Sequence, residues 1–204
     1  MPLYRDFSDQ NATILVWKYN EDDDLRAEEL LEPENAEKVK DYHPKKMLEV
    51  LMVRKLLKSL KPNSKILYRD REPYLDTMDA EISITHSFPY AALALSKNKI
   101  GIDVEKFNPK ILRLIDKFTY ENERGFIPEN LASTFYTIIW SVKESMYKIH
   151  HSKYWSLKKN YEVKPFQLEY LDKIGCRVYD ETYSDEFNAR VKFFDDYCFT
   201  IVEE

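Results

Sequence analysis

The segment LASTFYTIIWSVKESMYKI, residues 131–149, decides most of the fold, because its apolar side chains recur at helical spacing. At ~100° per residue these side chains form one stripe, which we expect to pack on a sheet. The stripe consists of Phe135, Ile138, Ile139, Val142, Met146 and Ile149. Trp140, Glu144 and Lys148 follow one another at steps of four on the other side. An indole there indicates that this side lines a cleft, although Glu144 and Lys148 alone could form an ordinary ion pair.

Short β-branched and aromatic runs flank this helix and an earlier one, which keeps helical spacing from Met47 to Leu56 and ends at Lys61-Pro62. Another helical stretch follows Pro109. The predicted strands cover residues 13–19, 65–68, 81–85, 90–96, 100–105, 177–179, 189–194 and 197–202. Turn residues 96–99 predict an antiparallel hairpin, and Asp195-Asp196 predicts a second turn.

The order of these elements predicts an α+β (α/β) fold with two comparable halves that meet near residue 100. We expect residues 1–100 and 101–204 to be the two halves of one compact body, since no flexible linker or repeat separates them. Each half contains strands and one long helix, so each should be a small, mostly antiparallel sheet packed against its helix.

The composition, 204 residues with 44% apolar and 33% charged, is that of a globular chain. No apolar run is long enough to span a membrane, and the first residues lack a secretion signal, so we expect a cytoplasmic protein without a membrane partner. Cys176 and Cys198 read as small core residues in a reducing compartment.

The formal charge of −5 argues against nucleic acid as a partner, because such affinity comes from a basic surface. The three glycines, Gly101, Gly125 and Gly175, lie far apart in the sequence. This spacing excludes glycine-rich phosphate loops and dinucleotide fingerprints. A bound phosphate must therefore be held by side chains, helix ends or a metal.

Carboxylates alternate in the predicted strand Gly101-Ile102-Asp103-Val104-Glu105. Asp103 and Glu105 share one face, while Ile102 and Val104 point into the core. Mutual repulsion and partial burial should raise the pKa of at least one acid unless a cation lies between them, and a hard divalent ion is the natural one. Two solvated acids on an edge strand are the alternative interpretation.

These segments together resemble the 4′-phosphopantetheinyl transferase superfamily, in its longer, surfactin-synthetase-activator type. The resemblance is carried by residues 101–105 and by Trp140-Ser141-Val142-Lys143-Glu144-Ser145, followed by Lys148. It extends over about residues 40–155. Residues 82–87, which end in Thr85-His86-Ser87, the pair Pro73-Tyr74 and Arg54 resemble further family positions.

The resemblance implies a monomeric enzyme whose two halves are related by a pseudo-twofold axis, with the cofactor between them. It also implies transfer of the 4′-phosphopantetheine arm of coenzyme A to a serine of an acyl or peptidyl carrier protein, with release of adenosine 3′,5′-bisphosphate. Magnesium on the pyrophosphate would be coordinated by Asp103, Glu105 and Glu144. The other implied ligand contacts are Lys143 and Lys148 at the phosphates, His86 with Thr85 at the 3′-phosphate or ribose, and Arg54 at the 3′-phosphate.

The transferred group must be attacked by a deprotonated serine, and Glu144 is the candidate base, either directly or through a metal-bound water. Lys148 and magnesium would stabilise charge on the departing nucleotide. The chain departs from the family pattern at two places. Just before Pro73-Tyr74 it has Arg71-Glu72, where the family often has a lysine. The basic pair Lys45-Lys46 has altered spacing, so neither Lys45 nor Lys46 is assigned a ligand contact.

Two other functions fit the same residues: a different magnesium-dependent phosphoryl enzyme, such as a nuclease, and a non-catalytic module that binds coenzyme A or a carrier protein. The pathway of the carrier protein is not specified by the sequence. A basic and aromatic rim could dock an acidic carrier protein, or could simply be a solvated surface. It runs from Lys143 through Tyr154, Trp155, Lys158 and Lys159.

Overall fold

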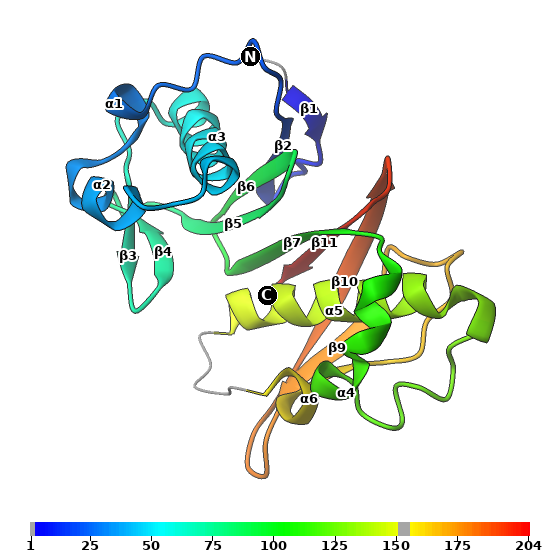
Figure 1. Ribbon diagram of the computed structural model, residues 1–204. Coiled ribbons are helices and arrows are strands. Elements are labelled where there is room, and N and C mark those ends of the chain that lie inside the picture. The colour runs from blue at the N-terminus through cyan, green and yellow to red at the C-terminus, as the bar shows by residue number, and fades with distance from the viewer. Residues whose placement is uncertain (1–2, 151–155) are drawn as a thin grey trace. The chain divides into compact units, whose positions relative to one another are not determined.

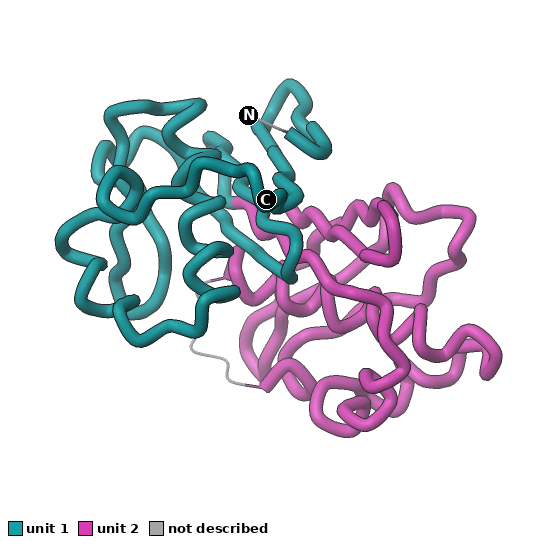
Figure 2. Tube along the Cα trace, turned by 45° about the horizontal axis from the view of Figure 1, so that its top comes forward, with its two compact units in different colours: residues 1–99 teal, residues 100–204 magenta. Residues whose placement is uncertain are grey.

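The computed structural model describes residues 3–150 and 156–204. The chain divides into two compact units, Met1–Lys99 and Ile100–Glu204 (Figure 2). Each unit contains a main antiparallel sheet and one long helix, which confirms the predicted α+β class. The pseudo-twofold relation between the halves stays a prediction. None of the helices in the described residues is both long and apolar enough to cross a bilayer.

The first unit is built on a four-stranded sheet in the order β1-β2-β6-β5, with every neighbouring pair antiparallel. Strands β3 and β4 form a separate two-stranded ribbon. The elements are β1 (Leu3–Asp6), β2 (Ala12–Lys18), α1 (Ala27–Leu30), α2 (Pro33–Val39), α3 (Pro44–Leu60), β3 (Ile66–Arg69), β4 (Glu72–Leu75), β5 (Glu81–Ser87) and β6 (Tyr90–Ser96).

Helix α3 packs on the sheet of this unit, mainly against β6 (Figure 1). Pro44 occupies its first turn, and the ring of the capping residue His43 accepts a hydrogen bond from the Lys45 amide at 3.3 Å. Its apolar side chains are buried in one cluster with the sheet, whose members include Trp17, Met52, Leu56, Leu57 and Leu93. The helix ends at Leu60, directly before Lys61-Pro62, as the sequence predicts.

A two-residue turn joins β3 to β4, because Arg69 pairs with Glu72. Both turn residues have positive φ, 50° at Asp70 and 74° at Arg71. This is the backbone of a mirror-image hairpin turn, in which Asn-Gly or Asp-Gly is favoured. Arg71 thus occupies a position at which glycine would be unstrained. The backbone conformation therefore does not favour an arginine at this position.

The second unit is built on a five-stranded antiparallel sheet in the order β7-β11-β10-β9-β8. Its long helix α5 packs most extensively on β7 and β11. The elements are β7 (Ile100–Lys106), η1 (Pro109–Arg113), α4 (Ile115–Phe118), η2 (Glu129–Leu131), α5 (Ala132–Ile149), α6 (Leu157–Asn160), β8 (Tyr161–Val163), β9 (Ile174–Tyr179), β10 (Ser184–Phe194) and β11 (Tyr197–Glu203).

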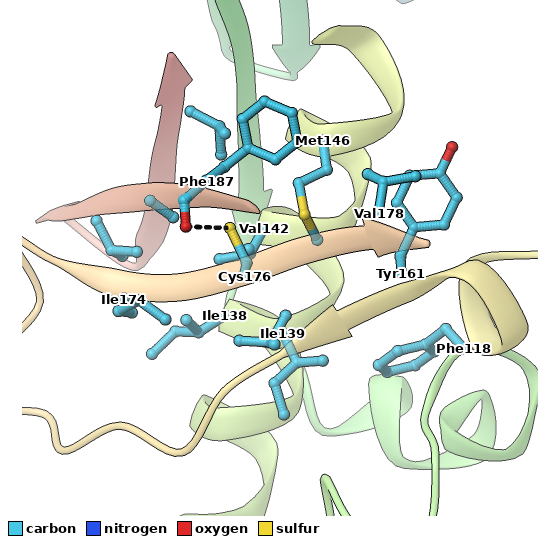
Figure 3. Close-up of a cluster of buried hydrophobic side chains, with 14 of the residues drawn as sticks. Phe118, Ile138, Ile139, Val142, Met146, Tyr161, Ile174, Cys176, Val178 and Phe187 are labelled. Carbon is cyan, nitrogen blue, oxygen red and sulfur yellow. Dashed lines mark hydrogen bonds between the residues drawn. The ribbon is translucent and has the colours of Figure 1, made fainter. Parts of the chain in front are cut away.

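The apolar stripe predicted for α5 is confirmed, since all six of its residues are at most 4% exposed. All of them except Phe135 belong to one buried cluster with the sheet, and Figure 3 shows part of this cluster, including Val142, Met146 and Cys176. The Cys176 thiol donates a weak hydrogen bond to the Phe187 carbonyl at 3.6 Å. Both cysteines are unbridged and buried, as expected of core residues.

The hairpin predicted at residues 96–99 is wrong. Strand β6 pairs with β2 and β5, whereas β7 pairs with β11 in the other unit's sheet. Both edges of β6 are therefore occupied, and the turn-forming residues instead carry the chain from one unit to the next. The turn predicted at Asp195-Asp196 is confirmed, because Phe194 pairs with Tyr197 and Asp195 has a φ of 48°.

Candidate active site

Strand β7 passes very close to helix α5. A Cβ atom built on Gly101 would overlap the backbone carbonyl of Ser145, so no larger residue fits without moving the helix. Because residues two apart share a face, Asp103 and Glu105 also face α5. Ile102 and Val104 are buried on the opposite face.

Asp103 is only 5% exposed although β7 is an edge strand. Its Oδ1 accepts a hydrogen bond from Lys148 Nζ at 2.9 Å, and the same ammonium group donates to the Ile102 carbonyl at 2.8 Å. The interpretation of the acids as solvated edge-strand residues is therefore wrong. Helix α5 covers them instead.

The contacts of Trp140 explain why an indole lies on this side of α5. Its indole Nε1 donates a hydrogen bond to Glu105 Oε1 at 2.8 Å, and its ring meets the Phe118 ring edge-on at a centroid distance of 5.2 Å. The indole is therefore partly covered, and its hydrogen bond orients the Glu105 carboxylate.

Three carboxylates interact at this place. The pKa of Glu105 is raised to about 7, first by burial, then by Asp103 and Glu144, while Trp140 and Lys148 oppose the shift. The pKa of Glu144 is also raised, by burial and by the Asp103 carboxylate, again against the effect of Lys148. The protein thus concentrates more negative charge here than Lys148 balances.

Such an excess of carboxylate oxygens is relieved by a hard divalent cation, and the donor set matches that of magnesium. Within residues 3–150 and 156–204, no group of three or more His, Cys, Asp or Glu side chains is arranged as a metal-binding cluster. Lys148 supplies the positive charge at Asp103. A metal ion would therefore share Asp103 with Lys148 or move its ammonium group.

Lys143 does not take the phosphate-binding place implied for it. Its side chain is 0% exposed, and its ammonium donates to Glu123 Oε2 at 2.7 Å. It also donates to the carbonyls of Phe118 at 2.6 Å and Leu157 at 3.1 Å. Because these acceptors enclose the ammonium in the interior, the structure does not make it available to coenzyme A.

The first unit contains a cavity of about 540 Å³ with a strongly basic wall. His86 and Arg54, both predicted as ligand contacts, line it. Arg54 is nevertheless 3% exposed and is paired through Nε with Glu32 Oε2 at 2.7 Å. Its charge is therefore largely balanced within the protein, and it supports the cavity wall more than it adds positive charge.

Thr85 is not among the residues that line the cavity. Its neighbours Ile84 and His86 do line it, and Thr85 is 5% exposed. Since adjacent residues of a strand point to opposite faces, the Thr85 side chain lies on the far face of β5 from His86. The structure therefore supports a cavity contact for His86 but not for the Thr85 side chain.

The cavity contains cations to which sequence reasoning assigned no contact: Lys38, Lys46 and Arg71. A signal for Lys46 was present, since Lys46, Val50 and Arg54 follow one another at steps of four on α3 and all line the cavity. No comparable periodicity marks Arg71, which reaches the cavity from the β3–β4 turn.

Comparison with known proteins identifies a family whose sequence pattern covers these acids and helix α5. A sequence model of the 4′-phosphopantetheinyl transferase superfamily matches residues 99–202, which include the acids of β7 and all of α5. The chain is also 30% identical over 117 residues to the 4′-phosphopantetheinyl transferase gsp of Aneurinibacillus migulanus. That alignment covers 54% of this chain and 49% of the relative, so the chain spans about half the length of the curated relative it matches.

Proposed function

Because the chain belongs to the 4′-phosphopantetheinyl transferase superfamily, we propose that it transfers the phosphopantetheine arm of coenzyme A to a serine of an acyl or peptidyl carrier protein. Adenosine 3′,5′-bisphosphate is the other product. The reaction is a phosphoryl transfer in which the serine oxygen forms a bond to the β-phosphorus and the bond from that phosphorus to the bridging oxygen breaks.

One observation carries this proposal: the carboxylates of Asp103, Glu105 and Glu144 act on one another beside a single ammonium group, that of Lys148, which is 2.9 Å from Asp103 Oδ1. Burial first, and then this mutual repulsion, raise the pKa values of Glu105 and Glu144. A site with this excess of negative charge suits a divalent metal that in turn binds a pyrophosphate. In the proposal these three residues hold magnesium, which supplies charge neutralisation at the pyrophosphate.

The protein's own residues then perform the proton and charge steps. Glu144 accepts the proton of the incoming serine, and its raised pKa brings it closer to neutral pH, where a general base works best. Lys148 donates hydrogen bonds from its ammonium to the departing phosphate oxygens as charge develops there. Its side chain is 26% exposed, so it reaches solvent and ligand in a way that Lys143 does not.

The cavity of the first unit suits the phosphorylated nucleoside end of the same substrate. Its lining combines the apolar side chains of Val39, Val50 and Ile84 with the cations described above. Apolar walls favour a purine ring, and cations favour a phosphate monoester. We therefore assign His86 and the neighbouring cations to that end of coenzyme A.

The test is intact-mass analysis of a purified carrier protein incubated with coenzyme A and magnesium. The expected result is a mass increase of one phosphopantetheine group, lost when EDTA replaces magnesium and when Asp103 is changed to Asn. A carrier protein that gains no mass, although coenzyme A binds normally, would favour a non-catalytic binding module. Hydrolysis of DNA without transfer would favour a different phosphoryl enzyme.

The carrier-docking rim is a further part of the proposal, and the structure describes only some of it. Tyr154 and Trp155 lie outside the described residues. Lys158 donates to the Asp116 carbonyl at 3.1 Å, and Lys159 borders an open depression on the surface. Charge reversal at both lysines should weaken carrier binding and reduce its salt dependence, with an unchanged affinity for coenzyme A as the control.

The compartment and the oligomeric state are proposed as well. We propose a cytoplasmic monomer, and light scattering of the purified chain tests the monomer. A dimeric mass that persists on dilution would contradict it.

A further inference from the structure

A buried carboxylate stands behind the basic wall of the cavity in the first unit. Glu49 of α3 is 9% exposed. Its Oε1 accepts a hydrogen bond from the Phe88 amide at 3.0 Å, and its Oε2 lies 3.1 Å from His86 Nδ1. Two separate donors therefore fix the Glu49 side chain, and both come from the end of β5 and the residue after it.

The imidazole of His86 continues the chain of contacts toward the cavity. Because Nδ1 donates to Glu49, Nε2 of the neutral ring is an acceptor. Lys46 Nζ lies 2.5 Å from that Nε2 and 3.8 Å from Glu49 Oε2. The arrangement is a hydrogen-bonded chain in which an ammonium donates to an imidazole and the imidazole donates to a carboxylate.

The exposed end of this chain faces a ligand space. Lys46 and His86 both line the 540 Å³ cavity, and Lys46 keeps 40% of its side chain exposed. A lysine side chain is flexible and loses rotamer freedom when it binds a ligand. The contact with His86 already limits that freedom, so the ammonium is held at the wall before a ligand arrives.

The same chain affects the charge of Lys46. Burial lowers the pKa of Lys46, and the Glu49 carboxylate opposes that shift. The other ionisable groups that face Lys46 or the same cavity are His86, Lys38, Tyr42, Arg54, Tyr68, Asp70 and Arg71. Among the groups of the described residues that act on Lys46, Glu49 favours its charged form.

We propose that Glu49 is a positioning residue, which acts through His86 to hold the Lys46 ammonium at the wall of this cavity, where Lys46 meets the 3′-phosphate of coenzyme A. The identity of the ligand rests on the proposed function, whereas the arrangement of the three side chains does not. Glu49 does not line the cavity and would touch no ligand there. It sets the tautomer of His86 and keeps Lys46 charged and in place.

Calorimetric titration with coenzyme A and with 3′-dephospho-coenzyme A tests the ligand contact. Lys46→Gln should weaken coenzyme A binding about 10- to 100-fold, the loss expected for one charge-assisted hydrogen bond, and leave the binding of dephospho-coenzyme A almost unchanged. Glu49→Gln should weaken coenzyme A binding about three- to tenfold, since Phe88 and His86 donate to different oxygens of Glu49 and the amide replaces one of these acceptors with a donor. Glu81→Gln, an exposed acid on β5, is the matched control and should match the wild type.

Two readouts separate positioning from a merely structural effect. Affinity for coenzyme A should begin to fall at a lower pH in Glu49→Gln than in the wild type, because Lys46 loses its proton sooner without the carboxylate. Nitrogen-15 NMR of His86 should show the Nδ1–H tautomer in the wild type and a larger Nε2–H fraction in Glu49→Gln. Circular dichroism checks that each variant is folded.

The outcomes distinguish this inference from the proposed function. A folded Glu49→Gln with wild-type affinity, pH profile and His86 tautomer overturns the inference alone, and so does an equal loss for both forms of coenzyme A in Lys46→Gln. If the wild type binds no coenzyme A, the proposed function and the ligand assigned to Lys46 are both overturned. Should coenzyme A bind as expected without any transfer, only the proposed function is overturned.

Discussion

Two lysines of helix α5 have opposite environments. Lys143 and Lys148 each meet a carboxylate, Glu123 at 2.7 Å and Asp103 at 2.9 Å. The side chain of Lys143 is 0% exposed, whereas that of Lys148 is 26% exposed. In the first pair, a buried ammonium is matched by a buried carboxylate. In the second pair, the carboxylate belongs to a group of acids whose negative charge exceeds that of the one ammonium.

The contacts of Glu123 show why the first pair is structural. Besides Lys143, this carboxylate accepts hydrogen bonds from the amides of Tyr120 at 2.7 Å and Val163 at 2.8 Å. Lys143 in turn holds the carbonyls of Phe118 and Leu157. The pair therefore ties the segment from Phe118 to Glu123, the start of α6 and the end of β8 to α5.

Removal of the Lys143 ammonium should produce the largest effect. In Lys143→Met, Glu123 would remain as a buried charge without its cation, which costs about 3–5 kcal/mol of unfolding free energy. Lys148→Met is the comparison variant and should cost less, about 1–3 kcal/mol: Asp103 is also buried, but the Lys148 ammonium is 26% exposed, so water can partly replace it at that carboxylate. Urea denaturation monitored by circular dichroism measures both, and equal losses would contradict the distinction.

The transfer rate should be affected in the opposite order: among variants that fold, Lys148→Met should lose more activity than Lys143→Met. In the proposed reaction Lys148 donates to the developing charge, so in Lys148→Met the transfer rate should fall about 10²- to 10³-fold, equivalent to about 2.7–4 kcal/mol. The measurement is kcat/KM for carrier modification by mass spectrometry, with Lys148→Arg as a variant that keeps the charge. Near-normal turnover in Lys148→Met would remove Lys148 from the proposed chemistry.

The apolar period of α5 made its burial predictable, because six side chains at helical spacing have only one face on which to pack. The alternation in β7 likewise placed Asp103 and Glu105 on one face. These features are local. They follow from the repeat of a single element and need no knowledge of what packs against it.

The position of Lys143 shows what a local pattern misses. It lies four residues after Ile139 and three before Met146, so it belongs to the buried side of α5 despite its charge. Its partner Glu123 comes from an irregular segment that carries no periodic signal. The incorrect hairpin at residues 96–99 has the same origin, since turn residues do not reveal that the edges of β6 pair with β2 and β5.

The burial of Glu105 and Glu144, together with the surplus negative charge beside Lys148, should make the free energy of unfolding depend on pH. The folded-state pKa of Glu105 is raised from 4.5 to about 7, so the native chain keeps a proton that the unfolded chain releases between these values. Stability from this group is therefore present below pH 4.5 and is lost as pH rises through about 7. Glu144 acts in the same direction.

Thermal unfolding between pH 5 and 8.5, with and without magnesium, measures this effect. The melting temperature should fall with rising pH, and magnesium should raise it more at pH 8 than at pH 5, because the metal binds deprotonated carboxylates. Glu105→Gln should flatten the profile. A magnesium effect that is equal at both pH values would argue against these acids as the metal site.

The smallest expected effect concerns a cation that the backbone holds at a conformational cost. Arg71 has a φ of 74°, and glycine adopts that conformation without strain, so Arg71→Gly should stabilise the protein by about 1 kcal/mol. The same variant removes a cation from the cavity and should weaken coenzyme A binding. Loss of the Arg71 side chain should therefore raise the free energy of unfolding and weaken ligand binding, whereas loss of the Lys143 ammonium lowers the free energy of unfolding. Denaturation and calorimetry on one sample of Arg71→Gly test both halves, and a loss of stability together with unchanged binding would place Arg71 with Lys143 as a structural residue.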